Sequence, residues 1–288
     1  MGLIQPVRCG EALRDEMLAT TVGDGAALWW LGQSGFVLKT PAGVVVFDPY
    51  LSDSLTRKYA ASDKPHVRMT ELVMEPRLLD FVDVVTSSHN HTDHLDAETL
   101  RPLMEVNPGV KLVIPEANRA FVAERLGCDA TWPVGVDDGV SQRVAAFTID
   151  GIAAAHDRVE RDEAGRCRYL GYVVRFDAGG REMRVYFSGD TLMHDALVPA
   201  LKAYGGLDVA MLPINGRRPE RRVAGNLFGD EAARLAHEVG ARLVVPCHYE
   251  MFTFNTESPA LFTRTCEELG QAYRVLRCGE CVRLMQGG

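Results

Sequence analysis

Three imidazoles and a carboxylate stand close together in one short stretch of the chain, at His89, His91, Asp93 and His94. The whole sequence contains only 8 histidines, so this concentration is unusual. Neutral imidazole and carboxylate oxygen are the donors that borderline divalent metal ions accept. The motif therefore predicts a metal site, and metal-assisted hydrolysis is the chemistry that such a site supports best.

The backbone expected around this motif gives it the reach to bind two ions. An apolar run at 81–85 precedes the motif and is typical of a short strand. Side chains alternate along an extended segment, so His89 and His91 face the same side and can chelate one ion. The chain then turns into a helix, and Asp93 and His94 are expected to point toward a second position.

Three more strand ends carry donors of the same kind. His156 is expected to complete the ligands of the first ion, His248 those of the second, and Asp190 to bridge the two. Two ions about 3.5–4 Å apart could share a metal-bound hydroxide and polarise an oxygen of the substrate. Asp93 and His94 are the expected catalytic residues, and Asp93 would also carry a proton to the leaving oxygen.

These donors need strands and helices to hold them, and apolar periodicity predicts both. Strands and helices alternate twice along the chain without a long linker, which favours one α/β domain over residues 1–288, made of two similar halves. The polar stretch 51–77 is predicted to be a lid-like loop. The strands are expected at 27–32, 36–39, 44–47, 81–85, 110–114, 144–149, 152–155, 169–176, 183–187, 209–212, 243–246, 273–276 and 282–285. The helices are expected at 97–105 with Asp96 as its cap, 118–126, 195–202, 229–239 and 259–269.

Composition narrows the class of protein. Of 288 residues, 47% are hydrophobic, which is ordinary for a globular chain with a large core. The net charge of -8 argues against a nucleic-acid partner, and no apolar run is long enough for a membrane helix. Seven scattered cysteines favour reduced thiols, so we expect a cytoplasmic protein whose partner is a small molecule. The oligomeric state stays open, and a homo-oligomer is one of the alternatives.

A basic cluster stands out in this acidic chain, at Arg217, Arg218, Arg221 and Arg222. Guanidinium groups match phosphate and carboxylate oxygens in pairs, so the cluster is either a clamp for a phosphorylated or carboxylated substrate or a solvated turn. Some polar residues near the expected metal edge are further candidates for substrate binding, namely Asn215, His194 and Tyr249.

The full set of donors resembles the metallo-β-lactamase superfamily. The resemblance rests on the HxHxDH motif at 89–94, on His156, on Gly189-Asp190 and on His248. It implies an αββα four-layer sandwich of the metallo-β-lactamase type, with two mixed β-sheets flanked by helices and the metals at one edge. Asp48 matches an early strand-end aspartate of the superfamily, and we expect it to hold a ligand histidine or the motif loop by hydrogen bonds.

Within the superfamily, the segments 29–36, 188–190 and 208–213 resemble the L-ascorbate-6-phosphate lactonase group. The resemblance implies a hydrolase that opens a lactone of the sugar or sugar-phosphate type, with one or two divalent ions, zinc or manganese, and iron as a further candidate. The chain departs from that group at His156, which favours two ions. Two alternatives stay open: a phosphodiesterase of the phospholipase D type with the same metals, and a non-catalytic metal-binding relative.

Overall fold

The first strand shows how the sequence produces layers in the computed structural model, which describes residues 2–285. All seven residues of β1 (Ala26–Gly32) are buried. Alternate side chains of a strand point to opposite faces, so Leu28 and Trp30 belong to one hydrophobic core and Trp29 to another. A strand that is buried on both faces must lie between two other layers.

Seven strands form the first sheet, in the order β13-β1-β2-β3-β4-β5-β6. The pairs from β13 to β3 are antiparallel, and those from β3 to β6 are parallel. The strands after β1 are β2 (Gly35–Thr40), β3 (Gly43–Phe47), β4 (Val84–Thr86), β5 (Lys111–Pro115), β6 (Val134–Val136) and β13 (Cys281–Leu284).

The second sheet has six strands, in the order β12-β11-β10-β9-β8-β7. Here β12, β11 and β10 are parallel, and the remaining pairs are antiparallel. Both sheets are therefore mixed, and in each the carboxyl ends of parallel strands open on one edge. The strands are β7 (Ser141–Val144), β8 (Phe147–Ala153), β9 (Leu170–Ala178), β10 (Arg181–Phe187), β11 (Leu207–Pro213) and β12 (Ala241–Cys247).

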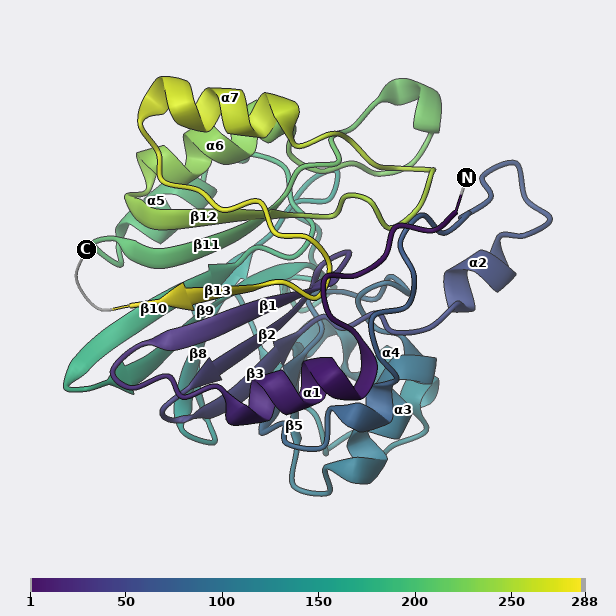
Figure 1. Cartoon of the computed structure of the whole chain (residues 1–288), viewed down its shortest axis with the longest axis horizontal. Coiled ribbons are helices and arrows are strands. Elements are labelled where there is room, and N and C mark those ends of the chain that lie inside the picture. Colours follow the sequence, from purple (N-terminus) through teal and green to yellow (C-terminus); the bar gives the residue numbers. More distant parts are fainter. Residues whose placement is uncertain (1, 286–288) are drawn as a thin grey trace.

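Helices cover the outer face of each sheet (Figure 1). α1, α3 and α4 pack on the first sheet, and α5, α6 and α7 lie on the opposite side of the molecule. The predicted four layers, with two mixed sheets between helices, are confirmed. The helices are α1 (Gly10–Ala19), α2 (Ser54–Lys58), α3 (Ala97–Val106), α4 (Arg119–Leu126), α5 (Leu197–Lys202), α6 (Gly229–Glu238) and α7 (Ala260–Leu269), with 3-10 turns at Pro76–Leu78, Glu116–Asn118 and Pro219–Arg221.

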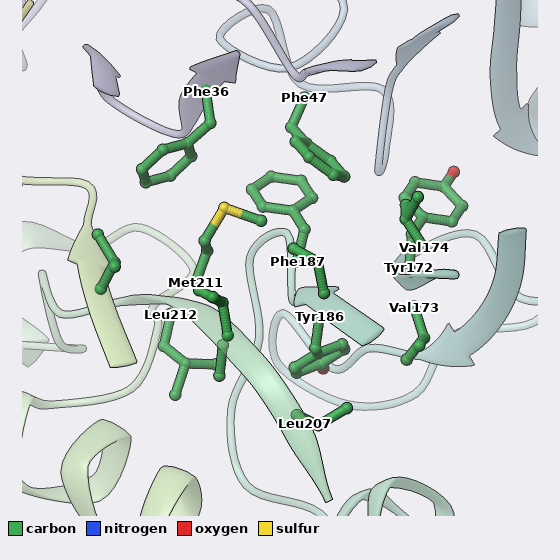
Figure 2. Close-up of a cluster of buried hydrophobic side chains, with 14 of the residues drawn as sticks. Phe36, Phe47, Tyr172, Val173, Val174, Tyr186, Phe187, Leu207, Met211 and Leu212 are labelled. Atoms are coloured by element: carbon green, nitrogen blue, oxygen red, sulfur yellow. The ribbon is translucent and has the colours of Figure 1, made fainter. Parts of the chain in front are cut away.

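The two sheets meet in a core of large side chains (Figure 2). Phe36 and Phe47 come from the first sheet, and Phe187 and Met211 from the second. The ring centroids of Phe47 and Phe187 lie 5.1 Å apart. Burying side chains of this size contributes about 1.5–3 kcal/mol each, so this interface fixes one sheet against the other.

Some predicted elements differ from those observed. Parts of the strands predicted at 144–149 and 152–155 form one continuous strand, β8, whereas Val144 ends β7. Within β8 the carboxylate of Asp150 accepts from Ser141 and Arg175. The segment 273–276 makes only an isolated bridge at Tyr273 instead of a strand. Asp96 does precede α3, but its carboxylate accepts from the Thr99 hydroxyl rather than from a backbone N–H.

Two helices were not expected, and one lies within the predicted lid. α1 buries only Leu13 and Met17, too sparse a pattern to predict a helix. α2 is a short helix inside the stretch 51–77. None of the helices in the described part of the chain is long and apolar enough to cross a bilayer.

Candidate metal centre

The predicted donors come together because their strands end at the same edge. The motif loop follows β4, His156 follows β8, Asp190 follows β10 and His248 follows β12. β8 and β10 both run antiparallel to β9, so they point the same way. The carboxyl ends of strands that share a direction converge, and the loops after them meet there.

His89, His91 and His156 form the first group of donors. Their ligand atoms all lie within 4.8 Å of one another. The ring centroids of His89 and His91 are 4.6 Å apart, and those of His91 and His156 are 4.9 Å apart. This group, the His triad, has the composition and spacing of a three-ligand site for one divalent ion.

Asp93, His94 and His248 form the second group, the Asp triad, which meets the same distance criterion. Asp93 Oδ2 lies 3.6 Å from His94 Nε2 and 3.5 Å from His248 Nε2. All three residues were predicted as ligands of the second ion, and the structure brings them to one place.

Asp190 lies between the two triads. Its Oδ1 is 3.3 Å from His94 Nε2. Its Oδ2 is 3.7 Å from His156 Nε2 and 3.6 Å from His248 Nε2. The carboxylate thus reaches members of both triads, which is the position that a bridging ligand needs.

Unpartnered atoms in this cluster fit a bound cation. His89 Nε2, His94 Nε2 and Asp190 Oδ1 are buried, and none has a hydrogen-bond partner among the described residues. Leaving such atoms unpaired costs about 1–3 kcal/mol each, and metal ions at the two triads would satisfy them. The mixture of nitrogen and oxygen donors is one that zinc, manganese and iron accept.

The ionisation of the cluster points the same way. Burial lowers the pKa of His89 well below its usual value, and the neighbouring imidazoles lower it further. Burial opposes the charge on Asp190, yet His94 and the other imidazoles hold its pKa well below the usual range. Burial also opposes a charge on His94, but Asp190 and Asp93 raise its pKa well above normal. The centre therefore attracts positive charge, which a divalent ion supplies.

Asp48 lies behind the ligands and is fully buried. Its carboxylate accepts hydrogen bonds from His94 Nδ1 at 2.8 Å, from the Thr86 hydroxyl at 2.7 Å and from the Ser88 backbone N–H at 3.0 Å. It therefore holds both a ligand histidine and the start of the motif loop. Because Nδ1 of His94 is engaged, its Nε2 is left to face the centre.

Gln33 is a site residue that sequence reasoning missed. Its side-chain Nε2 donates to Asp93 Oδ2 at 2.8 Å and lies 3.0 Å from His248 Nε2. Its backbone oxygen accepts from the His248 N–H at 2.9 Å. The one available signal was a polar residue directly after the buried strand β1.

Some of these residues have left-handed backbone conformations. The φ angle is 50° at Gln33, 35° at Asp48 and 64° at His248. Non-glycine residues adopt this region at a cost of about 1–2 kcal/mol. The surrounding hydrogen bonds hold the backbone there, which is typical of functional sites.

Members of both triads line a cleft of about 530 Å³. Part of its wall comes from the stretch 51–77, so the predicted lid does border the site. The lining residues are Leu55, Lys58, Tyr59, Lys64, His66, Asn90, His91, Thr92, Asp93, Phe121, Arg125, His156, Asp190, Val223, Ala224, His248, Phe254 and Asn255.

The arginine cluster does not line this cleft. Arg217 pairs with Glu231, with its Nη1 2.5 Å from Oε2. Arg218 and Arg221 both pair with Glu257. Arg222 likewise pairs with Asp63 of the lid. These carboxylates come from α6 and from distant loops, so the basic run is neutralised in the fold rather than aimed at the triads.

The other predicted substrate-binding residues also have partners within the fold. The Tyr249 hydroxyl donates to the Leu276 oxygen, and its ring stacks on Trp30 with centroids 4.4 Å apart. His194 Nε2 contacts the Ala153 oxygen at 2.9 Å. The Asn215 amide donates to Asn255 Oδ1 at 3.1 Å, and Asn255 does line the cleft. Tyr249, His194 and Asn215 themselves do not line the cleft.

Comparison with known sequences identifies relatives over most of the chain. The profile of the β-lactamase superfamily domain matches residues 44–249. A protein of Rubrobacter xylanophilus described as a UPF0173 metal-dependent hydrolase is 29% identical over 251 residues, which cover 85% of this chain and 90% of that protein. A protein of Pyrococcus furiosus with the same description is 26% identical over 259 residues, covering 88% and 98%.

Solved structures share the arrangement of elements at low sequence identity. Igni18, a metallo hydrolase of Ignicoccus hospitalis, superposes with a TM-score of 0.63 at 21% identity, covering 89% of this chain and 97% of that one. An isothiocyanate hydrolase from Delia radicum gut bacteria gives a TM-score of 0.68 at 18% identity, covering 89% and 98%. At these identities the likeness concerns the fold.

Proposed function

The chain belongs to the metallo-β-lactamase superfamily of metal-dependent hydrolases, and from that premise we propose that it hydrolyses a lactone at the two triads. One observation carries the proposal: His, Asp and bridging carboxylate donors converge at an open cleft. A purely structural metal site would be closed by protein ligands, whereas a catalytic site leaves room for substrate.

The residues fit two divalent ions. The His triad would hold one ion and the Asp triad the other. Asp190, which lies within 3.7 Å of His94, His156 and His248, would contact both. When bound, such ions lower the pKa of a water molecule to about 7 and polarise the oxygen of the bond under attack.

The chain fixes how its imidazoles face the centre. Asp48 accepts from Nδ1 of His94, and the Gly225 oxygen accepts from Nδ1 of His156 at 3.0 Å. In each ring Nε2 then carries the free lone pair and points at the centre. This preorganisation spares the reaction the cost of turning the rings.

Asp93 is the residue that we assign to proton transfer. It lines the cleft, and Gln33 holds one of its oxygens. Its carboxylate would accept the proton released by the attacking water and deliver it to the ring oxygen as the acyl C–O bond breaks, which gives the hydroxyl of the opened product. His94, in the same triad, would keep Asp93 and Asp190 in their places.

A lactone suits this arrangement because ring opening needs only a nucleophile, stabilisation of an oxyanion and one proton. The likeness of segments 29–36, 188–190 and 208–213 to the lactonase group supports the same substrate class. The curated relatives are described as metal-dependent hydrolases, which agrees with the reaction type.

The test combines metal content with a substrate panel. Freshly purified protein is analysed for metal per chain and assayed against sugar lactones, sugar-phosphate lactones and a phosphodiester. We expect about two ions per chain, as in other two-metal sites, and turnover of lactones. His89→Ala and Asp190→Ala should lose metal and turnover together, while His237→Ala, exposed on α6, serves as the control.

The other outcomes would each replace the proposal. Cleavage of the phosphodiester but of no lactone would make the protein a phosphodiesterase. A fully metallated protein that is inert on the whole panel would favour a binding function. Turnover that persists in a metal-free variant would overturn the role of the triads.

A further inference from the structure

Three cationic side chains line the cleft without a carboxylate partner. They are Lys58 on α2, Lys64 in the lid and Arg125 on α4. Across residues 2–285, none of them forms an ion pair with an Asp or Glu of the chain. Every arginine from 217 to 222, by contrast, is paired.

Arg125 is held rigidly on one side and is free on the other. Its Nη1 donates to the Asn90 oxygen at 2.6 Å and to the Leu95 oxygen at 3.2 Å. Its guanidinium lies 4.4 Å from the centroid of the Phe121 ring. The described residues offer no hydrogen bond to Nε or Nη2, so this edge of the fork is available to an oxyanion.

Lys58 approaches the same loop from the lid. Its Nζ lies 3.4 Å from the Thr92 hydroxyl and 5.1 Å from the centroid of the Tyr59 ring. The Lys64 ammonium is engaged by the Arg222 backbone oxygen, which leaves its charge uncompensated. Lys58 is exposed, so it can reorient toward a ligand at little cost.

The residues that Arg125 and Lys58 contact alternate in the sequence with the predicted metal ligands. Arg125 contacts Asn90 and Lys58 contacts Thr92, and these two residues flank His91. A group held by both cations would therefore lie in the same cleft as the triads.

We propose that Arg125 and Lys58, with Lys64 at the rim, form a subsite for an oxyanion carried by the substrate, a phosphate ester or a carboxylate. The inference rests on the proposed lactonase function and specifies which lactones the cleft selects. It also assigns the anion-binding role to cations that line the cleft, in place of the arginine cluster, which does not.

The test compares three lactones of one sugar series on the metal-loaded protein: a neutral lactone, its phosphate ester and its carboxylated analogue. The measured quantity is the ratio of kcat/KM for each anionic lactone to that for the neutral one. We expect a ratio above one for the wild type. In Lys58→Met it should fall about threefold, as for an exposed charge contact.

Arg125→Gln should lower the ratio by about tenfold or more, since it removes a charge-assisted pair of bonds. Arg125→Lys should recover part of the loss, because it restores the charge without the fork. Lys111→Met is the matched control, since Lys111 is an exposed lysine at the start of β5 and lies outside the cleft. Metal content is measured for each variant. If Arg125→Gln binds less metal than the wild type, the test is decided by Lys58→Met instead.

The outcomes separate the two proposals. If no lactone is opened by metal-loaded wild type, the proposed function fails. If lactones are opened but the ratio is near one, or if Lys58→Met changes the anionic and neutral substrates equally, the subsite is wrong while the lactonase stands. A selective loss for the phosphate ester or for the carboxylate shows which oxyanion the subsite takes.

Discussion

The metal centre and the mouth of the cleft, formed by the lid at 51–77 and the loop at 216–226, are built by different means. Asp48, behind the centre, is fully buried and accepts bonds from three directions. At the mouth, Arg218 pairs with Glu257, and their side chains are 51% and 21% exposed. Buried networks specify one geometry, whereas exposed ion pairs contribute little and exchange easily. The centre is thus preset for chemistry, and the mouth is free to vary with the substrate.

Lowering the pH should give the largest difference between the two regions. Burial lowers the pKa of His89 and His91, so in the fold both stay neutral below the unfolded value of about 6.5. A depressed pKa means that stability is full above about 6.5 and is lost as pH falls toward the folded pKa. Protons compete with metal for these imidazoles, so we expect the ions and the activity to be lost as pH falls below about 6.5 toward the folded pKa.

The mouth should outlast the centre in the same titration. The hydrogen bond from Arg218 lowers the pKa of Glu257, so this pairing is present above about pH 4.3 and disappears only as pH falls through the folded pKa. Metal per chain after dialysis, and protease sensitivity of the lid, are followed from pH 7.5 to 4. Lid cleavage that precedes metal release would contradict the contrast.

Asp48→Ala should give the next largest effect. It removes the partner of His94 Nδ1 and the carboxylate that accepts from the Thr86 hydroxyl. Loss of such a partner typically lowers metal affinity by about 10–100-fold. Competition with a chelator measures the affinity, and Asp53→Ala, an exposed aspartate at the mouth, is the control. Equal affinities in both variants would remove the distinction between the regions.

Gln33→Ala should have a smaller effect. The variant keeps the fold of the turn but frees Asp93, which the amide holds at 2.8 Å. We expect kcat to fall about tenfold, the value of one hydrogen bond to a charged group, with metal content preserved. The pH profile of kcat should shift as well, because Asp93 loses a donor. An unchanged profile would show that Gln33 only packs.

Arg217→Ala should have the smallest effect. The ion pair with Glu231 is partly exposed and is worth about 1 kcal/mol or less. The variant should therefore lose that much stability in urea unfolding and keep kcat/KM on an anionic lactone, since Arg217 lies outside the cleft lining. Glu231→Gln is the matching control. A large loss of affinity for anionic substrates alone would favour the clamp, one of the two interpretations of the arginine cluster that the sequence left open.

The sequence predicted the centre better than the mouth for a physical reason. His89, His91, Asp93 and His94 are close in sequence, and His156 and the other donors follow apolar strands whose common direction brings their ends together. Both signals are local. The fold followed in the same way, since strands with two apolar faces must lie between layers.

The partners of polar side chains are not local, and there the predictions were weaker. The carboxylates that neutralise Arg217 and Arg221 lie at Glu231 and Glu257, and nothing in the run of arginines points to them. Gln33 was missed because its role depends on Asp93, 60 residues away. The predicted strand ended at 149, just before Asp150, whereas the observed strand continues. The hydrogen bond that Arg175 donates to Asp150 across the sheet is not visible in the sequence.

The left-handed backbone at Gln33, Asp48 and His248 also limits how the protein can be made more heat-resistant. Glycine would relax each of these positions but would remove a side chain that the centre needs. Ala145 has the same kind of backbone, with φ at 52°, in the exposed turn between β7 and β8, where glycine removes nothing of use. Substitutions that raise thermostability should therefore be sought at peripheral turns, and the metal centre should keep its strained backbone in any stabilised variant.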